Sequence, residues 1–129
     1  MKFLRGTFIG LVCLVVGVLV VWQPLPTQAQ GAAPAKGKPA LYEFGAKYCI
    51  PCKEMQRVMA ELKPQYSDQV ELRMVYADEE MPLFQQYKIV AIPTQVFFDA
   101  SGKVVDQHIG ALPKEEVIKK LKELKFIAN

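Results

Sequence analysis

At 129 residues the chain has room for one domain, and its 51% of hydrophobic residues suits a globular protein that carries one additional hydrophobic segment. Sixteen lysine and arginine residues stand against thirteen acidic residues. Two of the basic residues and none of the acidic ones fall in the first 29 positions, so the remainder carries a net charge of only +1. This balance excludes a nucleic-acid-binding protein that depends on a basic stripe.

The N-terminus has the pattern of an export signal. Lys2 and Arg5 precede an uncharged run over residues 8–22, and this order directs the rest of the chain out of the cytoplasm. Small residues near position 29 predict a cleavage that removes residues 1–29. The alternative is a retained membrane anchor, because the run is longer than most cleavable signals and shorter than the roughly 20 residues of a membrane helix. Either outcome places the domain in the periplasm or another extracytoplasmic compartment.

The segment after the signal differs in composition from the domain that follows. Residues 30–38 are rich in alanine, glycine, proline and lysine and show no apolar periodicity, which predicts a flexible linker. We expect the folded domain to occupy residues 39–129, without an internal repeat.

The first two elements of the domain are a strand and a helix. The apolar and aromatic run over residues 41–44, closed by Gly45, predicts the strand. A helix follows, because Pro51 suits a first turn and apolar residues recur three and four positions apart after it. These apolar residues are Met55, Val58, Met59 and Leu62. We expect the helix to end at Lys63 and Pro64.

The remaining elements complete an α/β arrangement. Alternating apolar residues predict a strand over residues 70–76, and a short helix is expected over residues 81–87. Two further strands, over residues 95–98 and 103–109, flank a turn-forming stretch and should pair as an antiparallel hairpin. A last helix opens after Pro113. The order β-α-β-α-β-β-α predicts a mixed sheet flanked by helices.

Once the signal and its Cys13 are removed, the domain holds one cysteine pair, Cys49 and Cys52. Their spacing places both sulfurs on one side of the first turn of the predicted helix. The helix N-terminus favours the thiolate of Cys49, and Cys52 lies deeper in the turn. Disulfide exchange requires such a pair, in which one thiolate attacks and the second thiol resolves the mixed disulfide. Pro51 supports the pair by fixing φ in the turn and removing an N–H donor.

The alternatives for this pair are a structural disulfide and a metal site. A closed loop of about four residues stabilises a fold by only about 2 kcal/mol on the chain-entropy model, so an inert staple explains the pair poorly. Zinc usually takes four ligands, and besides the two cysteines the domain offers one histidine, His108, which we interpret as a surface or lining residue. No zinc site is therefore predicted. Copper(I) accepts thiolates, so a copper-binding or copper-delivery module using the same cysteines remains the alternative function.

Three segments of the chain resemble motifs of the thioredoxin family. Residues 44–53 (Phe-Gly-Ala-Lys-Tyr-Cys-Ile-Pro-Cys-Lys) resemble the active-site stretch, and residues 91–94 (Ala-Ile-Pro-Thr) resemble the cis-proline segment. Residues 110–112 resemble the stretch before the last helix, and the likeness covers about residues 41–124. The resemblance implies a short form of the thioredoxin fold and thiol:disulfide oxidoreductase activity.

The resemblance also implies roles for residues outside the cysteine pair. Pro93 would form a cis peptide bond beside the cysteines, and the backbone at Ile92 would bind the substrate chain as an added strand. Glu43 stands where thioredoxins have a buried aspartate that moves protons for the resolving cysteine. In a central strand its burial would raise its pKa and make it a base for Cys52. The alternative is a carboxylate that faces solvent from an edge strand.

The sequence departs from the family at positions that frame the cysteines. Ile50 replaces a glycine, Tyr48 replaces a tryptophan, and Met74 matches a frequent lysine on the next strand. The reduction potential therefore cannot be carried over from the family, and the physiological direction stays open. We also expect a trimmed fold, without the additional N-terminal strand and helix of full-length thioredoxins.

Together these features predict an exported thiol:disulfide oxidoreductase that acts as a reductant on disulfides of exported proteins. We expect its electrons to come from a membrane thiol donor, and its redox group to be the Cys49–Cys52 disulfide without a cofactor or metal. We also expect a monomer with no nucleic-acid partner and a possible membrane tether through residues 8–22.

Overall fold

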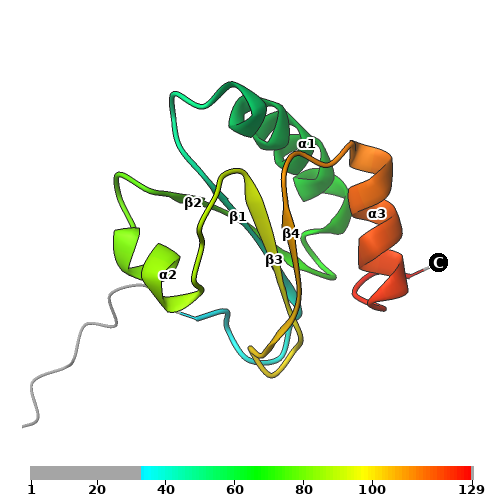
Figure 1. Ribbon diagram of the computed structural model, residues 1–129. Helices are drawn as coiled ribbons and strands as arrows, with labels where there is room; N and C mark the ends of the chain where they lie inside the picture. Colours follow the sequence, from blue (N-terminus) through cyan, green and yellow to red (C-terminus); the bar gives the residue numbers. More distant parts are fainter. Residues whose placement is uncertain (1–32, 129) are drawn as a thin grey trace, which may run out of the picture.

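The computed structural model describes residues 33–128, which form a sheet of four strands with three helices around it (Figure 1). In chain order the elements are β1 (Ala40–Gly45), α1 (Ile50–Tyr66), β2 (Glu71–Tyr76), α2 (Met81–Gln86), β3 (Thr94–Phe98), β4 (Val104–Ile109) and α3 (Lys114–Glu123). The predicted order and the α/β class are confirmed.

The predicted export segment lies outside the described residues, and so does the membrane tether proposed over residues 8–22. Within residues 33–128, no helix is long and apolar enough to cross a membrane. The boundaries of the signal and of the linker stay predictions.

The strands form one mixed sheet in the order β2-β1-β3-β4. β1 runs parallel to β2 and antiparallel to β3, and β3 pairs with β4 in the predicted antiparallel hairpin. In the hairpin turn the Asp99 carboxylate accepts hydrogen bonds from the N–H groups of Ser101 at 2.9 Å and Lys103 at 3.1 Å. Gly102 takes a φ of +85°, which glycine adopts without steric cost. β1, which leads into the cysteine pair, is thus an interior strand with a neighbour on each side.

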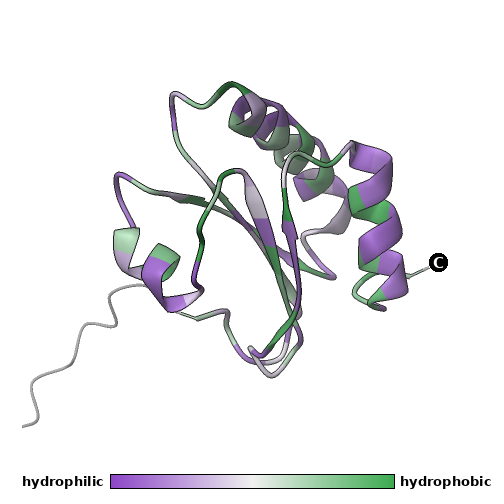
Figure 2. Ribbon diagram, viewed as in Figure 1, coloured by the Kyte–Doolittle hydropathy of each residue, from purple (hydrophilic) through white to green (hydrophobic). Residues whose placement is uncertain are grey.

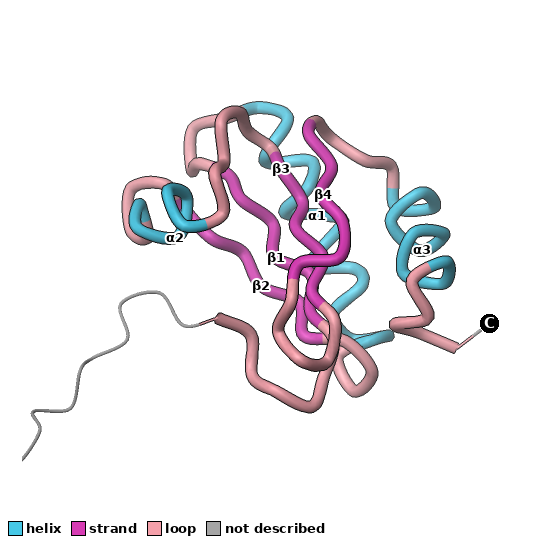
Figure 3. Tube along the Cα trace, turned by 60° about the horizontal axis from the view of Figure 1, so that its bottom comes forward, coloured by secondary structure: helices cyan, strands magenta, loops and turns pink. Residues whose placement is uncertain are grey.

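Helices cover both faces of this sheet, with α1 and α3 on one face and α2 on the other (Figures 1 and 3). Alternate strand residues face the two layers. Leu41 and Phe97 belong to the core beneath α1 and α3, whereas Tyr42 belongs to the core beneath α2. Figure 2 shows α3 as mostly hydrophilic with a hydrophobic part, and its buried residues are Val117 and Leu121. Full burial of a leucine or phenylalanine side chain stabilises the fold by roughly 1.5–3 kcal/mol.

Helix α1 does not end at Pro64 as predicted but continues to Tyr66. Proline lacks an N–H, so position 64 donates no hydrogen bond, and its ring crowds the carbonyl four residues earlier. The last turn is held by the N–H of Ser67, which donates to the Lys63 carbonyl at 3.1 Å, and by the packing of Tyr66 against the core beneath α1. Tertiary packing and capping therefore outweigh the local breaker signal.

The described part of the expected linker contacts the domain. The N–H of Gly37 donates to the Ala100 carbonyl at 2.7 Å, next to the β3–β4 turn. Lys38 Nζ donates to the Ser67 carbonyl at 2.8 Å, at the end of α1. These two hydrogen bonds join the segment before β1 to the β3–β4 turn and to the connection between α1 and β2.

Candidate active site

The cysteine pair lies at the N-terminus of α1. Cys49 is the N-cap residue, with φ −89° and ψ 120°, and its Sγ accepts a hydrogen bond from the N–H of Cys52 at 3.3 Å. Pro51 occupies the first turn, where a missing N–H leaves no intrahelical bond unmade. The two cysteines form a disulfide with a Cα–Cα distance of 5.1 Å. In the reduced form, the free N–H groups and partial positive charge of the helix end favour a thiolate on Cys49.

The two sulfurs differ in access. Cys49 is half-buried, whereas Cys52 has no exposed surface. Next to Cys49, the apolar side chains of Tyr48 and Ile50 are 94% and 77% exposed. Cys52 packs against Gly45 of β1, where an added Cβ would lie 3.2 Å from the cysteine Cβ and 3.4 Å from its Sγ. The glycine thus lets the helix lie close to the strand that supports it.

The segment before β3 reaches the same end of the sheet. The Ile92–Pro93 peptide bond is cis, which confirms that expectation from the resemblance. Thr94 pairs with Phe44 in the β1–β3 ladder, so one further step of the register places Pro93 opposite Gly45. The Pro93 carbonyl accepts a hydrogen bond from the N–H of Gly110 at 2.8 Å. Register and hydrogen bonding therefore bring the three motifs that were separate in the sequence to one edge of the molecule.

Glu43 lies in the interior of the sheet, two residues before Gly45 and on the same face of β1. Its side chain has no exposed surface, and neither carboxyl oxygen has a hydrogen-bond partner among residues 33–128. Burial raises the pKa of Glu43 from 4.5 to about 8. Gln95 on β3 is close enough to oppose part of this rise, although its amide does not complete a hydrogen bond. The burial expected for Glu43 is confirmed, and its role as a base stays a prediction.

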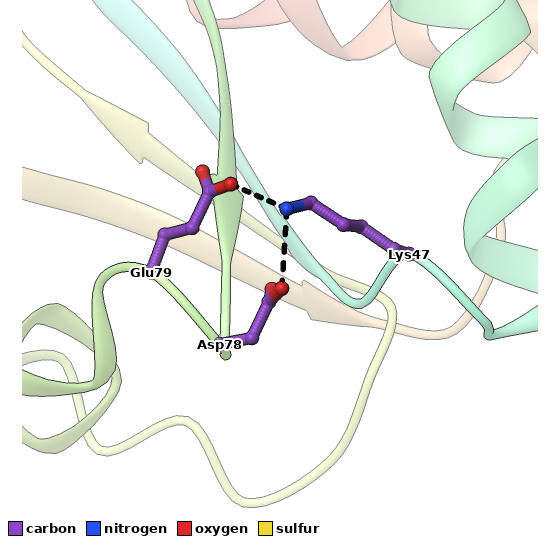
Figure 4. Close-up of polar contacts among 3 residues, drawn as sticks. All are labelled: Lys47, Asp78 and Glu79. Carbon is purple, nitrogen blue, oxygen red and sulfur yellow. Dashed lines mark hydrogen bonds and ion pairs between the residues drawn. The ribbon is translucent and has the colours of Figure 1, made fainter.

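A cluster of charges ties the loop before the cysteines to the loop after β2 (Figure 4). Lys47 Nζ lies 3.2 Å from a carboxylate oxygen of Asp78 and 2.5 Å from one of Glu79. The same ammonium group lies 5.8 Å from the centre of the Tyr76 ring. The two carboxylates raise the pKa of Lys47, which keeps it charged. All of these side chains are partly exposed, so each ion pair contributes little, and the cluster mainly orients the loop.

Sequence reasoning missed two contributors to the site, Lys47 and Gln95. Gln95 interrupts an otherwise apolar strand, and that polar residue was the one available signal. Lys47 had no signal, because Asp78 and Glu79 are more than 30 positions away. Both contacts depend on how strands and loops pair in space.

His108 lies half-buried on β4, opposite Gln95 in the β3–β4 ladder. Among residues 33–128, no three or more His, Cys, Asp or Glu side chains come together as a metal-binding group.

The cysteine pair lies at a helix N-terminus and packs on an interior strand, and a cis-proline lies at the same edge of the mixed sheet. This arrangement defines a disulfide oxidoreductase with a thioredoxin-like fold. Comparison with known proteins agrees. A family model described as thioredoxin matches residues 29–123.

Individual relatives extend this agreement. Thioredoxin 1 of Synechococcus elongatus is 42% identical over 76 residues, which cover 59% of this chain and 70% of the relative. Thioredoxin 2 of Chlorobaculum tepidum is 41% identical over 86 residues, which cover 67% of this chain and 78% of the relative. A thiol:disulfide interchange protein TxlA homolog of Synechocystis is 34% identical over 96 residues, which cover 69% of this chain and 53% of that protein. The chain belongs to the thioredoxin family, as a thioredoxin-like disulfide oxidoreductase with the pair Cys49–Cys52.

Proposed function

We propose that this oxidoreductase acts outside the cytoplasm, where it reduces disulfides in exported proteins. The observation that supports the exchange chemistry best is the asymmetry of the cysteine pair, with Cys49 accessible at the helix start and Cys52 buried. The export pattern at residues 1–29 supports the location.

The proposed reaction proceeds through a mixed disulfide. In the reduced protein the Cys49 thiolate attacks one sulfur of the substrate disulfide, a bond forms between these two sulfurs, and the other substrate sulfur leaves as a thiolate. Cys52 then loses its proton and attacks Sγ of Cys49. This second step releases the remaining substrate sulfur as a thiolate and forms the Cys49–Cys52 disulfide. Two electrons pass to the substrate, and the protein is left oxidised.

Glu43 is the group we assign to accept the Cys52 proton. Two residues along a strand span roughly 6–7 Å, so the Glu43 side chain starts about that far from Gly45, on the face of β1 against which Cys52 packs. A pKa of about 8 allows the carboxyl to change its protonation state near neutral pH, as proton transfer requires. The carboxylate would take the proton during substrate reduction, and the acid would return it when the disulfide is reduced again.

Apolar side chains around Cys49 supply a surface for an unfolded or extended substrate segment. Tyr48, Ile50 and Ile92 are all exposed, the last by 37%. Exposed apolar groups clustered beside a reactive residue are typical of a binding surface. We propose that the backbone at Ile92, just before the cis Pro93, pairs with the substrate chain as an added strand.

The oxidised pair must be reduced for another cycle. We propose a membrane thiol donor for this step, since residues 8–22 carry the export pattern or, if retained, a tether that would hold the domain near it. The domain would work as a monomer and without nucleic acid.

Turnover of a model protein disulfide with dithiothreitol as reductant tests the activity. We expect the wild-type protein to accelerate reduction of insulin, and Cys49→Ser to give only the rate of dithiothreitol alone. The exposed Ser101→Ala variant, in the distant β3–β4 turn, serves as a control that keeps full activity. Equal rates for wild type and Cys49→Ser would contradict the proposal.

The physiological direction, reduction or oxidation of substrates, depends on the reduction potential of the cysteine pair. Its equilibrium with glutathione measures that potential, and 30 mV corresponds to about 1.4 kcal/mol for two electrons. A potential well below that of glutathione supports a reductant, and one well above it supports an oxidant. No observation on the described residues favours copper delivery. Copper(I) retained through purification, and lost when either cysteine or His108 is replaced, would favour that alternative instead.

A further inference from the structure

Glu43 and Gln95 face each other from neighbouring strands inside the protein. They are register partners in the antiparallel β1–β3 ladder, so their side chains leave the same face of the sheet. Both residues have no exposed surface. Their four side-chain polar atoms have no hydrogen-bond partner among residues 33–128. Buried polar groups normally form hydrogen bonds, so two adjacent buried side chains that lack them call for an explanation.

The position of the pair connects it to the disulfide. Glu43 and Gly45 lie on the same face of β1, and Gly45 contacts Cys52 from beneath. Gln95 lies on the neighbouring strand β3, directly beside Glu43. We therefore expect Gln95 to act on Cys52 through this carboxyl.

Other titratable groups border this face from the packed elements, and each has a defined position. On β4, His108 lies opposite Gln95, and Asp106 is ion-paired with Lys120 of α3 at 2.7 Å. On β2 the residue opposite Glu43 is the uncharged Met74. The group from α1 is Cys52 itself. On β3 the residue opposite the Glu43 carboxyl is thus Gln95, which carries an uncharged amide.

We propose that Gln95 is a positioning residue for Glu43, whose amide holds the carboxyl beneath Cys52 and matches it in both protonation states. When Glu43 is ionised, Nε2 of Gln95 donates to the carboxylate. When Glu43 is protonated, Oε1 of Gln95 accepts from its O–H. A side-chain amide carries both a donor and an acceptor, so a rotation of the amide serves either state, and Gln95 itself gains and loses no proton.

This inference rests on the proposed function, because it assigns a partner to the base of that mechanism. Its physical consequence has a definite sign. Donation to the carboxylate favours the charged form, so Gln95 keeps the pKa of Glu43 lower than burial alone would set it. Without the amide, Glu43 would stay protonated to higher pH and would accept the Cys52 proton only there.

The first experiment follows the Glu43 carboxyl carbon by NMR during a pH titration of the reduced protein. Gln95→Met keeps the length of the side chain and removes its strong donor and acceptor. We expect the titration midpoint of Glu43 to rise by about one pH unit or more in this variant. Gln107→Met makes the same chemical change at an exposed position of β4 and should leave the midpoint unchanged. An unchanged midpoint in folded Gln95→Met would overturn the inference.

Gln95→Asn guards against a Met variant that fails to fold. It keeps the site polar and withdraws the amide by one methylene, so the midpoint should again rise. A midpoint equal to that of the wild type in this variant would count against a role that depends on the reach of the amide.

The second experiment measures how fast Cys52 releases a small thiol from a mixed disulfide at Cys49, as a function of pH. Gln95→Met should move the inflection of this profile upward, and the same substitution in a Glu43→Gln background should not move it. A purely structural glutamine would lower stability without moving either inflection. If the wild type reduces no protein disulfide, the proposed function fails, yet the NMR titration still decides whether Gln95 sets the state of Glu43.

Discussion

The half-buried Cys49 and the fully buried Cys52 belong to one helical turn, and this difference in burial gives the two sulfurs different chemistry. Cys49 caps the helix and accepts the N–H of Cys52, so its charge is stabilised where a substrate can reach it. Cys52, on the inner side of α1, packs against Gly45 and has no exposed surface. A substrate sulfur can therefore reach it only through a mixed disulfide that has formed at Cys49. We therefore expect attack on the substrate by Cys49 and resolution by Cys52.

This assignment predicts different products from two serine variants. Cys52→Ser should accumulate mixed disulfides with substrates, because Cys49 still attacks and nothing resolves the bond. Cys49→Ser should accumulate few, since its remaining thiol has no exposed surface. Non-reducing electrophoresis of each variant after reaction with a disulfide-bonded protein measures the trapped complex. Trapping by Cys49→Ser alone would reverse the assignment.

At this scale the sequence predicted the residues whose signal is local. The cysteine spacing, Pro51 in a first turn and the proline before an aromatic strand are all short patterns, and the structure places them together. Gln95 escaped prediction as a partner of Glu43 because the two are joined by a strand register across 52 positions. A register depends on the whole hydrophobic pattern and on the turns, so no short motif reports it.

Among the elements, β1 and α1 determine the site by their close approach. The approach is possible because position 45 carries no side chain, and a methyl group there would lie 3.2 Å from Cβ of Cys52. Cys52 has little freedom to retreat, because the helix fixes its backbone and the disulfide fixes its sulfur. A larger side chain at position 45 or at position 52 would therefore overpack this contact.

Gly45→Ala is expected to destabilise the oxidised protein by about 1–3 kcal/mol, the usual cost of overpacking a well-filled interior. Denaturant unfolding of the disulfide form measures the change in the free energy of unfolding. Asp99→Ala, in the β3–β4 turn away from the helix, offers a comparison in which a loss arises from turn hydrogen bonds and should leave disulfide exchange unaffected. Full stability in Gly45→Ala would show that α1 can shift away from β1.

The elements themselves were predicted well where periodicity was strong and poorly where a single residue was taken as a stop. Strand alternation and the three-and-four spacing of the helix located their elements within a few residues. The end of α1 was wrong because Pro64 removes one hydrogen bond, while packing of Tyr66 and the cap by Ser67 act at positions that a local rule does not consider. Tertiary contacts decided that boundary.

For the whole molecule, the interior carboxyl couples folding to pH. Among residues 33–128 the Glu43 carboxyl has no hydrogen-bond partner, and most of the side chains buried around it are apolar, so ionising it inside the fold is costly. The folded protein binds this proton up to a pH of about 8, whereas the unfolded chain releases it near pH 4.5. Between these values the folded state carries one more proton than the unfolded state.

The free energy of unfolding should therefore be highest, as far as this group is concerned, below about pH 4.5 and should fall by roughly 1.4 kcal/mol per pH unit until about pH 8. The total change approaches about 5 kcal/mol, a large share of the stability of a small domain. Urea unfolding of the oxidised protein at several pH values measures this slope.

Glu43→Gln should remove the slope and raise stability at pH 8, because an amide of the same shape is never ionised. Glu54→Gln, which changes an exposed glutamate on α1, should leave the slope in place. A wild-type stability that stays level or rises from pH 5 to 8 would mean that Glu43 ionises within the fold at low cost, and the same result would remove the proton-transfer role assigned to it.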